Sequence, residues 1–406
     1  MKDWACLQIG ARDHYVVARA LHRRQRLAAL VTDYWSRVPL GLKRSAVLRR
    51  AGERAHEELR DAHVVDFPWK TLAFEAGARF RGAEGWDRIC ARNSWFQACT
   101  ASELRRLRAQ EPALRGVFSY SYGAARPFRL ARDLGMKTIL GQIDAGPIEE
   151  DIVAAAHEKH AEYAGPWRRA PASYWESWRE EIRLSDRVVV NSEWSRRCLV
   201  KAGVDDSAIT VIPLAYEMPA GEERGMPRNA RRFSPSSPMK ILFLGQVTIR
   251  KGIAELLEAV DLLGSAPVEL IVAGPIAIRV PQRFRDHPKI RWWGPVPRGR
   301  ALELYRSADA FILPTLSDGF AITQLEALSA GLPLIVSRNC GDVVVNGDNG
   351  LLLEEVSAPA IAEAVLSLVR EPDLVARLAS STHHHGSTLA DFGARLEALL
   401  SVGSVS

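Results

Sequence analysis

Two acidic side chains and a turn lie close together in the segment between residues 313 and 337. The apolar run Ala310–Leu313 is typical of a buried strand, Asp318-Gly319 marks a turn after it, and Glu326 follows with seven residues between the two acids. A carboxylate can accept hydrogen bonds from two neighbouring hydroxyls at once, as on a ribose or a hexose. The segment therefore has the side chains to bind a sugar or a nucleotide.

The elements around these acids are predicted to be a strand, an acidic turn, a helix and a second strand. Pro314 ends the first strand, helical spacing of apolar residues begins near Ala321, Gly331 ends the helix, and Leu332–Val336 begins the next strand. The N–H groups at the helix start, Gly319–Thr323, would then form an anion site suited to phosphate. Taken alone, an acid in such a turn is commonly only a helix N-cap.

Two cations form the second chemical element. Arg250 and Lys251 follow Gly245 at a predicted strand end and precede a helix that opens at Gly252. An Arg offers a forked donor and a Lys a point charge, which together suit a diphosphate, although most such pairs are simply solvated. The sequence has no Asp-x-Asp pair of the kind that binds a metal and a diphosphate.

The segment closely resembles the acidic signature of glycosyltransferase family 4, in the residues Asp318-Gly319-Phe320, Glu326-Ala327 and Gly331–Ile335. Members of that family are retaining enzymes of the GT-B fold that use nucleotide-sugar donors. The family signature has two Glu separated by seven residues, so Asp318 keeps the spacing with a side chain one methylene shorter. Ala321 stands where the family usually has a second Gly. The resemblance implies an α/β protein of the GT-B fold, with two Rossmann-like doubly wound domains facing a central cleft.

The resemblance also implies roles for these residues. Arg250, Lys251 and Asp318 are expected to be catalytic: the cations stabilise the leaving diphosphate in place of a metal, and Asp318 contacts hydroxyls of the donor sugar. Glu326 is expected to hold the donor ribose. We expect no bound cofactor and no metal, with a nucleotide-diphosphate sugar as the donor substrate. The residues expected to bind the donor are Gly10, Gly245, Gly319, Phe320, Ala321, Ile322, Thr323 and Glu326.

Contacts to the acceptor or to the transferred sugar are expected from the first half of the chain. Many family members have a His-Asp pair where this sequence has Gln142 and Asp144, so these two residues are expected to make such contacts, together with His14. The aromatic-rich stretch 163–178 is typical of a helix packed in a core, but its rings could also stack on a sugar face.

A stretch rich in proline and serine divides the chain and is typical of a linker. We predict an acceptor-side Rossmann-like domain over residues 1–215, the linker at 216–238, and a donor-binding Rossmann-like domain over 239–388. As in the resembling family, a C-terminal helix over 389–402 is expected to pack back on the first domain.

Composition and cysteine use indicate a reducing compartment. With 406 residues, 47% of them hydrophobic and 25% charged, the chain is ordinary for a two-domain globular protein, and no apolar run approaches the ~18 residues of a transmembrane helix. The five cysteines are scattered without a CxxC pair, and no secretory signal is evident. We therefore expect a cytoplasmic protein, with peripheral contact to the inner membrane face as an alternative. The run His383–His385 is interpreted as solvated, not as a metal site.

The formal net charge of +6 is unevenly spread, with many basic residues near the N-terminus. A basic face can contact an anionic membrane, an anionic acceptor or nucleic acid, or it can simply be solvated. Because no nucleic-acid motif accompanies these residues, nucleic acid is not expected as a partner. The residues concerned are Arg12, Arg19, Arg23, Arg24, Arg26, Arg37, Lys43, Arg44, Arg49 and Arg50.

The family resemblance, together with these features, implies a retaining, metal-independent glycosyltransferase acting in glycan or cell-envelope polysaccharide biosynthesis. Its expected partners are a nucleotide-sugar donor and a sugar, glycan, lipid-linked or small-molecule acceptor. Three other hypotheses stay open: a nucleotide-sugar-binding protein without transfer activity, a sugar-nucleotide epimerase of the same architecture, and a phosphorolytic enzyme with a Lys-bound cofactor. Assays of transfer and donor hydrolysis distinguish the first two from a transferase, and absorbance would detect the cofactor.

Overall fold

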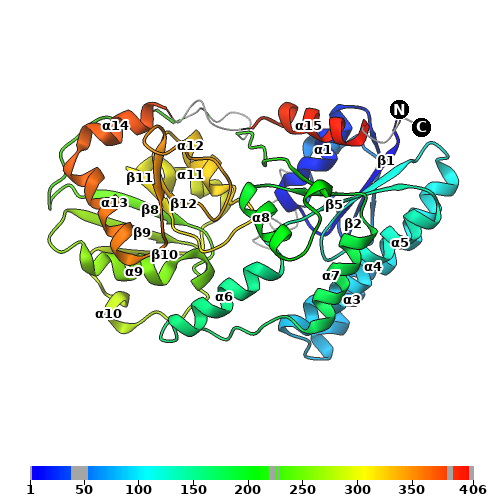
Figure 1. Ribbon diagram of the computed structural model, residues 1–406, viewed down its shortest axis with the longest axis horizontal. Helices are drawn as coiled ribbons and strands as arrows, with labels where there is room; N and C mark the ends of the chain where they lie inside the picture. The colour runs from blue at the N-terminus through cyan, green and yellow to red at the C-terminus, as the bar shows by residue number, and fades with distance from the viewer. Residues whose placement is uncertain are drawn as a thin grey trace.

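The computed structural model of the chain describes residues 2–37, 54–218, 223, 225, 226, 228–381 and 387–401. These residues form two lobes, each built on one parallel β-sheet with helices on both faces (Figure 1). The first sheet has the strand order β3-β2-β1-β4-β5-β6-β7, and the second has the order β10-β9-β8-β11-β12-β13. In each sheet the order reverses beside the first strand, which is the doubly wound Rossmann arrangement. The predicted pair of doubly wound α/β domains is confirmed.

The strands are short and apolar because helices cover both faces of each sheet. All paired strands run parallel. The first sheet contains β1 (Trp4–Gln8), β2 (Leu27–Thr32), β3 (Val64–Asp66), β4 (Gly116–Tyr120), β5 (Lys137–Gly141), β6 (Arg187–Val190) and β7 (Ile209–Val211). The second contains β8 (Met239–Leu244), β9 (Val268–Ala273), β10 (Ile290–Gly294), β11 (Ala310–Leu313), β12 (Leu334–Ser337) and β13 (Gly350–Leu353).

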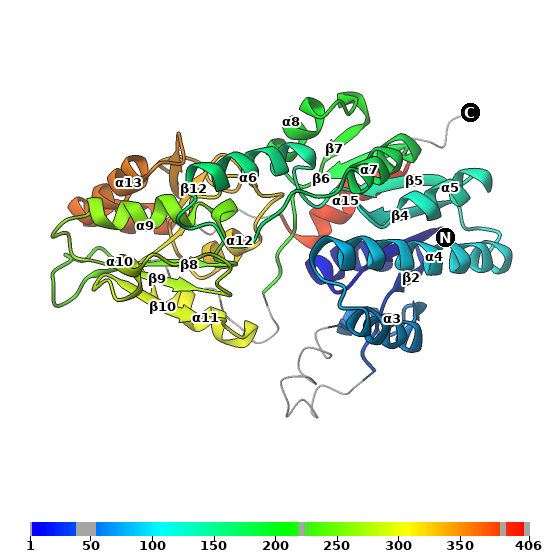
Figure 2. The same cartoon turned by 90° about the horizontal axis from the view of Figure 1, so that it is seen from below.

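Helices of the first lobe connect its strands and extend toward the second lobe. The helix α6 reaches across to the second lobe, where it contacts the short helix η5 (Figure 2). The first-lobe helices are η1 (Arg12–Tyr15), α1 (Val16–Arg23), η3 (Glu57–Leu59), α3 (Pro68–Phe80), α4 (Gly85–Gln110), α5 (Ala125–Asp133), α6 (Pro147–Lys159), α7 (Ala172–Leu184), α8 (Glu193–Lys201) and η4 (Asp206–Ala208).

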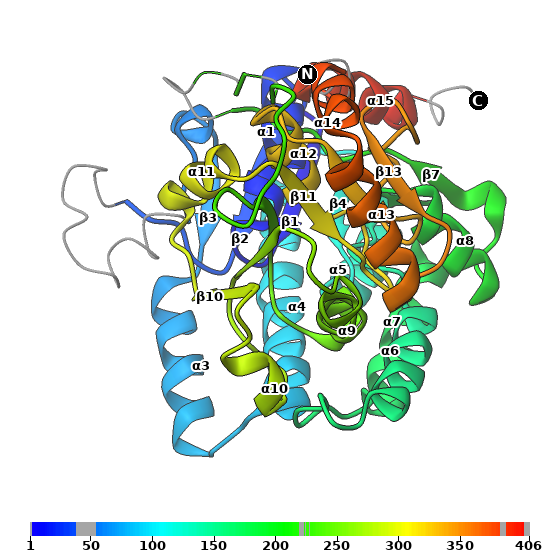
Figure 3. The same ribbon diagram turned by 90° about the vertical axis from the view of Figure 1, so that its left-hand side faces the viewer.

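Helices of the second lobe lie on both faces of its sheet. The helices α9 and α13 pack together on one face, and α11 and α12 lie together on the other (Figure 3). The last helix, α15, instead packs on α1 of the first lobe, where Glu397 forms an ion pair with Arg24 (Figure 1). These helices are η5 (Ile249–Lys251), α9 (Ile253–Leu262), α10 (Gln282–Arg285), α11 (Arg298–Ser307), α12 (Thr323–Ser329), α13 (Ala358–Arg370), α14 (Pro372–Ser380) and α15 (Leu389–Ser401).

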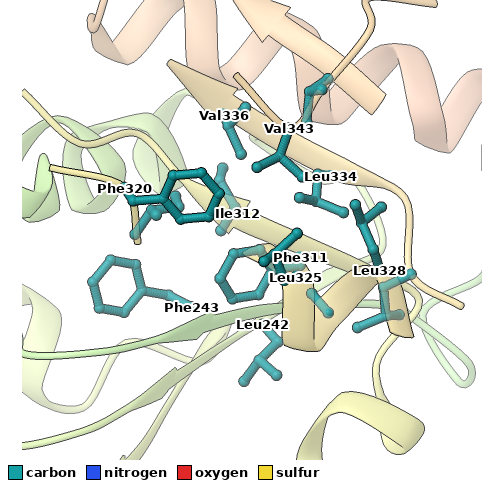
Figure 4. Packing of buried hydrophobic residues seen from close by; sticks show 14 of the residues in the cluster. Leu242, Phe243, Phe311, Ile312, Phe320, Leu325, Leu328, Leu334, Val336 and Val343 are labelled. Atoms are coloured by element: carbon teal, nitrogen blue, oxygen red, sulfur yellow. The ribbon is translucent and has the colours of Figure 1, made fainter. Parts of the chain in front are cut away.

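The core of the second lobe holds the acidic segment in place (Figure 4). Phe320, in the turn before α12, is 5% exposed and lies in the same cluster as Phe243 of β8 and Phe311 of β11. The apolar face of α12, with Leu325 and Leu328, packs into this cluster. Burial of each such side chain stabilises the fold by about 1.5–3 kcal/mol. The turn is therefore anchored on both sides of its acid.

The helix after the acidic turn begins later than the apolar spacing predicts. We expected helix from about Ala321, but α12 begins at Thr323. The reason is the backbone of Ala321, which has a φ of 62°, in the left-handed region that ends regular helix geometry. Glycine adopts this conformation without steric penalty, which explains why a glycine is usual at this place in the resembling family.

Candidate functional site

A cavity of about 300 Å³ lies between the lobes, at the carboxyl ends of the strands where each sheet reverses its order. In doubly wound folds this switch point is where ligands bind. We call it the central cavity. The first lobe contributes Arg12, Asp13, Ile143, Asn191 and Leu214, and the second contributes Leu244, Gly245, Gln246, Arg250, Lys251, Asp318, Phe320, Ala321, Ile322 and Thr323.

The two predicted cations and the first acid of the signature meet in this cavity. Lys251 Nζ forms an ion pair with the carboxylate of Asp318, and Arg250 Nη1 lies 3.8 Å from Asp318 Oδ2. Arg250 also donates a hydrogen bond of 2.8 Å to the carbonyl of Ser317. Gly252 permits this meeting, because a Cβ at its position would collide with the carbonyl of Pro314. The loops after β8 and β11 are therefore in contact, and the cations of the first pair with the carboxylate of the second.

Asp318 is an anion held by its two cationic neighbours. Burial raises its pKa, but Lys251 and Arg250 act in the opposite direction and more strongly, so the pKa lies below the ordinary value. The charge of Asp318 is thus retained at neutral pH. In the structure this carboxylate interacts with Lys251 and Arg250, the two cations that we expected to hold a diphosphate.

The loop after β1 faces the cavity with residues other than those expected. Arg12 and Asp13 line the cavity, whereas Gly10 and His14 do not belong to its lining. Gly10 donates its N–H to Asp33 Oδ1 at 2.9 Å, and His14 follows Asp13 within η1. Three successive residues here, Asp13 to Tyr15, have φ values of 46°, 53° and 59°. A run of non-glycine residues in the left-handed region is strained, and such strain is commonly concentrated at functional sites.

Gly319 lies against the first lobe. A Cβ at this position would collide with the carbonyl of Ile143, and the carbonyl of Gly319 accepts a hydrogen bond of 2.7 Å from Ser192 Oγ. The absence of a side chain therefore lets the acidic turn touch the backbone of the other lobe. Sequence reasoning had interpreted this glycine only as a turn residue and donor contact.

Gln142 and Asp144 form a hydrogen-bonded unit at the end of β5. Gln142 Nε2 donates to Asp144 Oδ1 at 2.8 Å, and Gln142 Oε1 accepts from Trp178 Nε1 at 3.0 Å. Asp144 Oδ1 also accepts from the hydroxyl of Tyr122 at 2.7 Å. Gln142 is 2% exposed and is therefore buried behind Asp144. Its hydrogen bond orients the carboxylate of Asp144.

Glu326 is engaged by a buried tyrosine. Its Oε2 accepts a hydrogen bond of 2.9 Å from the hydroxyl of Tyr305, which is 2% exposed. Glu326 does not belong to the set that lines the central cavity, so its expected contact with a donor ribose stays a prediction.

Residues 238–371 match the family described as glycosyl transferases group 1. This part of the chain is a group 1 glycosyltransferase domain. Among curated proteins, D-inositol 3-phosphate glycosyltransferase of Nocardiopsis dassonvillei is 25% identical over 264 residues, which cover 60% of this chain and 61% of that protein. The enzyme of the same name from Acidothermus cellulolyticus is 28% identical, over 50% of each chain. The chain thus spans half to three fifths of the length of these relatives.

Solved structures resemble the chain over nearly its whole length. Sucrose-phosphate synthase from Thermosynechococcus elongatus has a TM-score of 0.61 at 14% identity, with 98% of each chain covered. HepE from Anabaena in complex with UDP has a TM-score of 0.58 at 13% identity, covering 99% of this chain and 100% of that chain. At these identities the likeness shows the fold alone, and it confirms the GT-B fold in which the group 1 glycosyltransferase domain is the second lobe.

One residue beside the group 1 glycosyltransferase domain was missed by sequence reasoning. Glu149, in the first turn of α6, accepts a hydrogen bond of 2.7 Å from Ser317 Oγ, and its Oε1 lies 3.5 Å from Arg250 Nη1. Burial raises the pKa of Glu149 to about 7, against the opposing effect of Arg250. No signal in the sequence marks Glu149, because it lies in an acidic helix start that is typical of a solvated surface.

Two observations bear on metals and membranes. Among the described residues, no group of three or more His, Cys, Asp or Glu has the arrangement of a metal site. In the same part of the chain, no helix combines the length and apolar character required to cross a membrane. The run His383–His385 lies outside the described residues.

Five of the basic residues near the N-terminus, Arg19, Arg23, Arg24, Arg26 and Arg37, form ion pairs with carboxylates. Arg19 and Arg23 both contact Glu58 and Glu217. The remaining described pairs are Arg24 with Glu397, Arg26 with Asp3 and Glu397, and Arg37 with Asp66. Lys43, Arg44, Arg49 and Arg50 lie outside the described residues. Contact with an anionic surface stays a prediction.

Proposed function

We propose that the protein is a retaining, metal-independent glycosyltransferase that moves a sugar from a nucleotide-diphosphate sugar to an acceptor. The observation that carries the proposal is the meeting of Arg250, Lys251 and Asp318 at the switch point of a group 1 glycosyltransferase domain. UDP in the complex of a protein with the same fold supports a nucleotide donor. Retention is implied by the family resemblance.

The cations act on the leaving group. Breaking the bond between the anomeric carbon and the diphosphate leaves an electron pair and negative charge on a phosphate oxygen. Arg250 and Lys251 stabilise that charge, which a buried pair of cations does more effectively than water. The acceptor hydroxyl attacks the anomeric carbon on the same side, and its proton passes to the leaving phosphate oxygen.

Asp318 exchanges partners when the donor binds. Without donor it holds Lys251, so an incoming diphosphate competes with this carboxylate for the same cation. When Lys251 turns to the phosphate, Asp318 becomes free to accept hydrogen bonds from hydroxyls of the donor sugar. The donor thereby completes the site that it occupies.

The acceptor enters from the first lobe and is a sugar, a glycan, a lipid-linked sugar or a small molecule. The curated relatives are named for an inositol phosphate acceptor, which makes an anionic small molecule one candidate. A peripheral contact with an anionic membrane through the basic N-terminal region belongs to the proposal for a lipid-linked acceptor. Co-sedimentation with anionic vesicles at low and high salt tests it, and no binding at low salt would remove the membrane contact alone.

The proposal is tested with the purified chain and a panel of UDP-, GDP- and ADP-sugars. We expect one nucleotide class to raise the melting temperature and to be released from its sugar, slowly with water and faster with an acceptor. Stabilisation without any release would favour the nucleotide-sugar-binding protein. Conversion of the donor sugar without an acceptor would favour the epimerase. No stabilisation by any nucleotide would refute the proposal.

A further inference from the structure

A second and larger cavity, of about 360 Å³, adjoins the central cavity and shares Arg250 with it. On the first lobe it is lined by α6 and the aromatic-rich stretch 163–178. On the second lobe it is lined by η5 and the residue before it, Thr248. We call it the aromatic pocket. Its lining includes five aromatic side chains besides His157: Trp86, Tyr122, Trp167, Tyr174 and Trp175.

The aromatic rings divide between the core and this pocket. Tyr163 and Trp178 are 0% and 2% exposed and serve the core. Tyr174 and Trp175, by contrast, are partly exposed and line the pocket, with ring centroids 5.1 Å apart. The ring of Tyr174 stacks on that of Tyr122, with centroids 4.6 Å apart, so Trp175 is the better candidate of the two for contact with a sugar ring. The core interpretation therefore holds for Tyr163 and Trp178, and stacking on a sugar stays a prediction for the rings that line the pocket.

Trp167 is another lining residue of the pocket. Its ring stacks on His157, with centroids 4.9 Å apart and planes inclined by 22°. This contact holds the indole in one orientation, and the indole is only partly buried. The neighbouring Gly165 brings the wall against the second lobe, because a Cβ there would lie 2.9 Å from the carbonyl of Ala277. The pocket is thus closed by both lobes.

The polar groups of the pocket are mostly hydrogen-bond acceptors. Asp144, Glu149 and Glu150 all belong to its lining. Thr248 lines it as well, and its hydroxyl is buried with no hydrogen-bond partner within the described part of the chain. A buried hydroxyl without a partner is unfavourable, so this group points to a ligand that would hydrogen-bond to it. Sugar hydroxyls suit both carboxylates and this hydroxyl.

The charges of the pocket disfavour an anionic ligand. Three carboxylates line it, against the cations Arg250 and, when protonated, His157. Arg250 is already engaged by Ser317, Glu149 and Asp318, so it offers little to a second anion. A phosphate placed here would lie beside Asp144, whose carboxylate accepts hydrogen bonds from Tyr122, Gln142 and Gly146, all of them neutral donors, and like charges at short range repel.

We propose that the aromatic pocket binds the acceptor and that this acceptor is a carbohydrate without an anionic group, with a ring face held by Trp167 and Trp175. The inference rests on the proposed function, because a transferase requires an acceptor as a second substrate, next to the donor that Arg250 and Lys251 bind. Arg250, which lines both cavities, would then lie where the acceptor meets the leaving diphosphate. The proposal differs from the phosphorylated acceptor that the names of the relatives suggest.

The test uses the full chain with saturating nucleotide, chosen from UDP, GDP and ADP by stabilisation. Binding of two matched pairs is measured by ligand-observed NMR: glucose with glucose 6-phosphate, and myo-inositol with D-myo-inositol 3-phosphate. We expect at least one uncharged member to bind, and its phosphate ester to bind roughly 10-fold more weakly or not at all. Equal or tighter binding of the esters would overturn the inference, as would no binding of either uncharged sugar.

Variants of Trp167 locate the binding. Trp167→Ala is expected to weaken binding of the uncharged sugar about 10-fold, and Trp167→Phe to recover most of it. Trp69→Ala is the matched control, because Trp69 is 81% exposed on α3 and does not line the pocket. Unchanged affinity in a folded Trp167→Ala protein would overturn the assignment. Nucleotide binding without any sugar binding refutes only this inference, whereas no nucleotide binding refutes the proposed function.

Discussion

Replacement of Lys251 by Met tests the proposed chemistry most directly. The substitution keeps the length of the side chain and removes the charge that we assign to the leaving diphosphate. Loss of one charge-assisted contact made in the transition state lowers kcat/KM by about 30- to 1,000-fold, or ~2–4 kcal/mol. The assay is release of nucleotide from the donor sugar, with and without acceptor.

The structure also predicts an effect of this substitution on stability. The side chains of Lys251 and Asp318 are 11% and 16% exposed, so Lys251→Met leaves a buried carboxylate without its nearest cation. Breaking a buried pair in this way destabilises a fold by about 3–5 kcal/mol. Because Arg250 Nη1 remains 3.8 Å from Asp318, we expect the lower end of that range.

The pH dependence of this loss has a definite sign. The pKa of Asp318 is lowered in the folded state, so the ion pair stabilises the fold above the ordinary pKa of 3.8 and the stabilisation disappears as pH falls through the folded value. Unfolding free energies of the wild type and Lys251→Met should therefore differ at neutral pH and converge in acid. Denaturant titrations at several pH values measure this.

A double variant separates the two effects of Lys251. Lys251→Met combined with Asp318→Asn removes both charges, so it should regain much of the lost stability and none of the lost turnover. Lys137→Met, at an exposed position of β5, is the matched control. The reasoning is refuted if folded Lys251→Met keeps wild-type turnover, or if the double variant regains activity.

Three further predictions follow from the same site. Ala321→Gly should raise the free energy of unfolding by up to about 1 kcal/mol in denaturant titrations, because glycine relieves the left-handed backbone; a decrease would contradict this. Treatment with EDTA should leave transfer intact, since cations replace the metal, and lost activity restored by Mg²⁺ or Mn²⁺ would count against it. Between pH 4.5 and about 7, rising pH should destabilise the wild type relative to Glu149→Gln, because the raised pKa makes the folded state bind the proton more tightly; parallel stability curves would rule this out.

Sequence reasoning located the fold and the second-lobe half of the candidate site. The buried strand Ala310–Leu313 was predicted with its exact bounds, because a continuous apolar run ending at a proline leaves few alternatives. The family resemblance assigned Arg250, Lys251 and Asp318 to one site, but it did not predict that the two cations pair with this carboxylate. Strands of a parallel sheet, and the residues that follow them, can thus be predicted from local sequence patterns.

The first-lobe half was harder to predict because its contacts depend on the approach of the two lobes. Glu149 has no local signal, and it matters only because α6 reaches the loop of Arg250. Gly10 and His14 were chosen from loop position and stay predictions, whereas Arg12 and Asp13 of the same loop line the central cavity and were not predicted as site residues. The left-handed run that begins at Asp13 cannot be inferred from residue type, because it contains no glycine.

The contact between Gly319 and Ile143 links ligand binding at the site to the association of the two lobes. The turn that carries Asp318 is also a surface on which the two lobes meet, so a shift of this turn would disturb a contact between them. By thermodynamic reciprocity, any ligand that fixes this turn also strengthens the association of the lobes, and to the same extent. A protein with bound ligand should then unfold more cooperatively than one without it, although α15 on α1 and α6 on η5 join the lobes in either case.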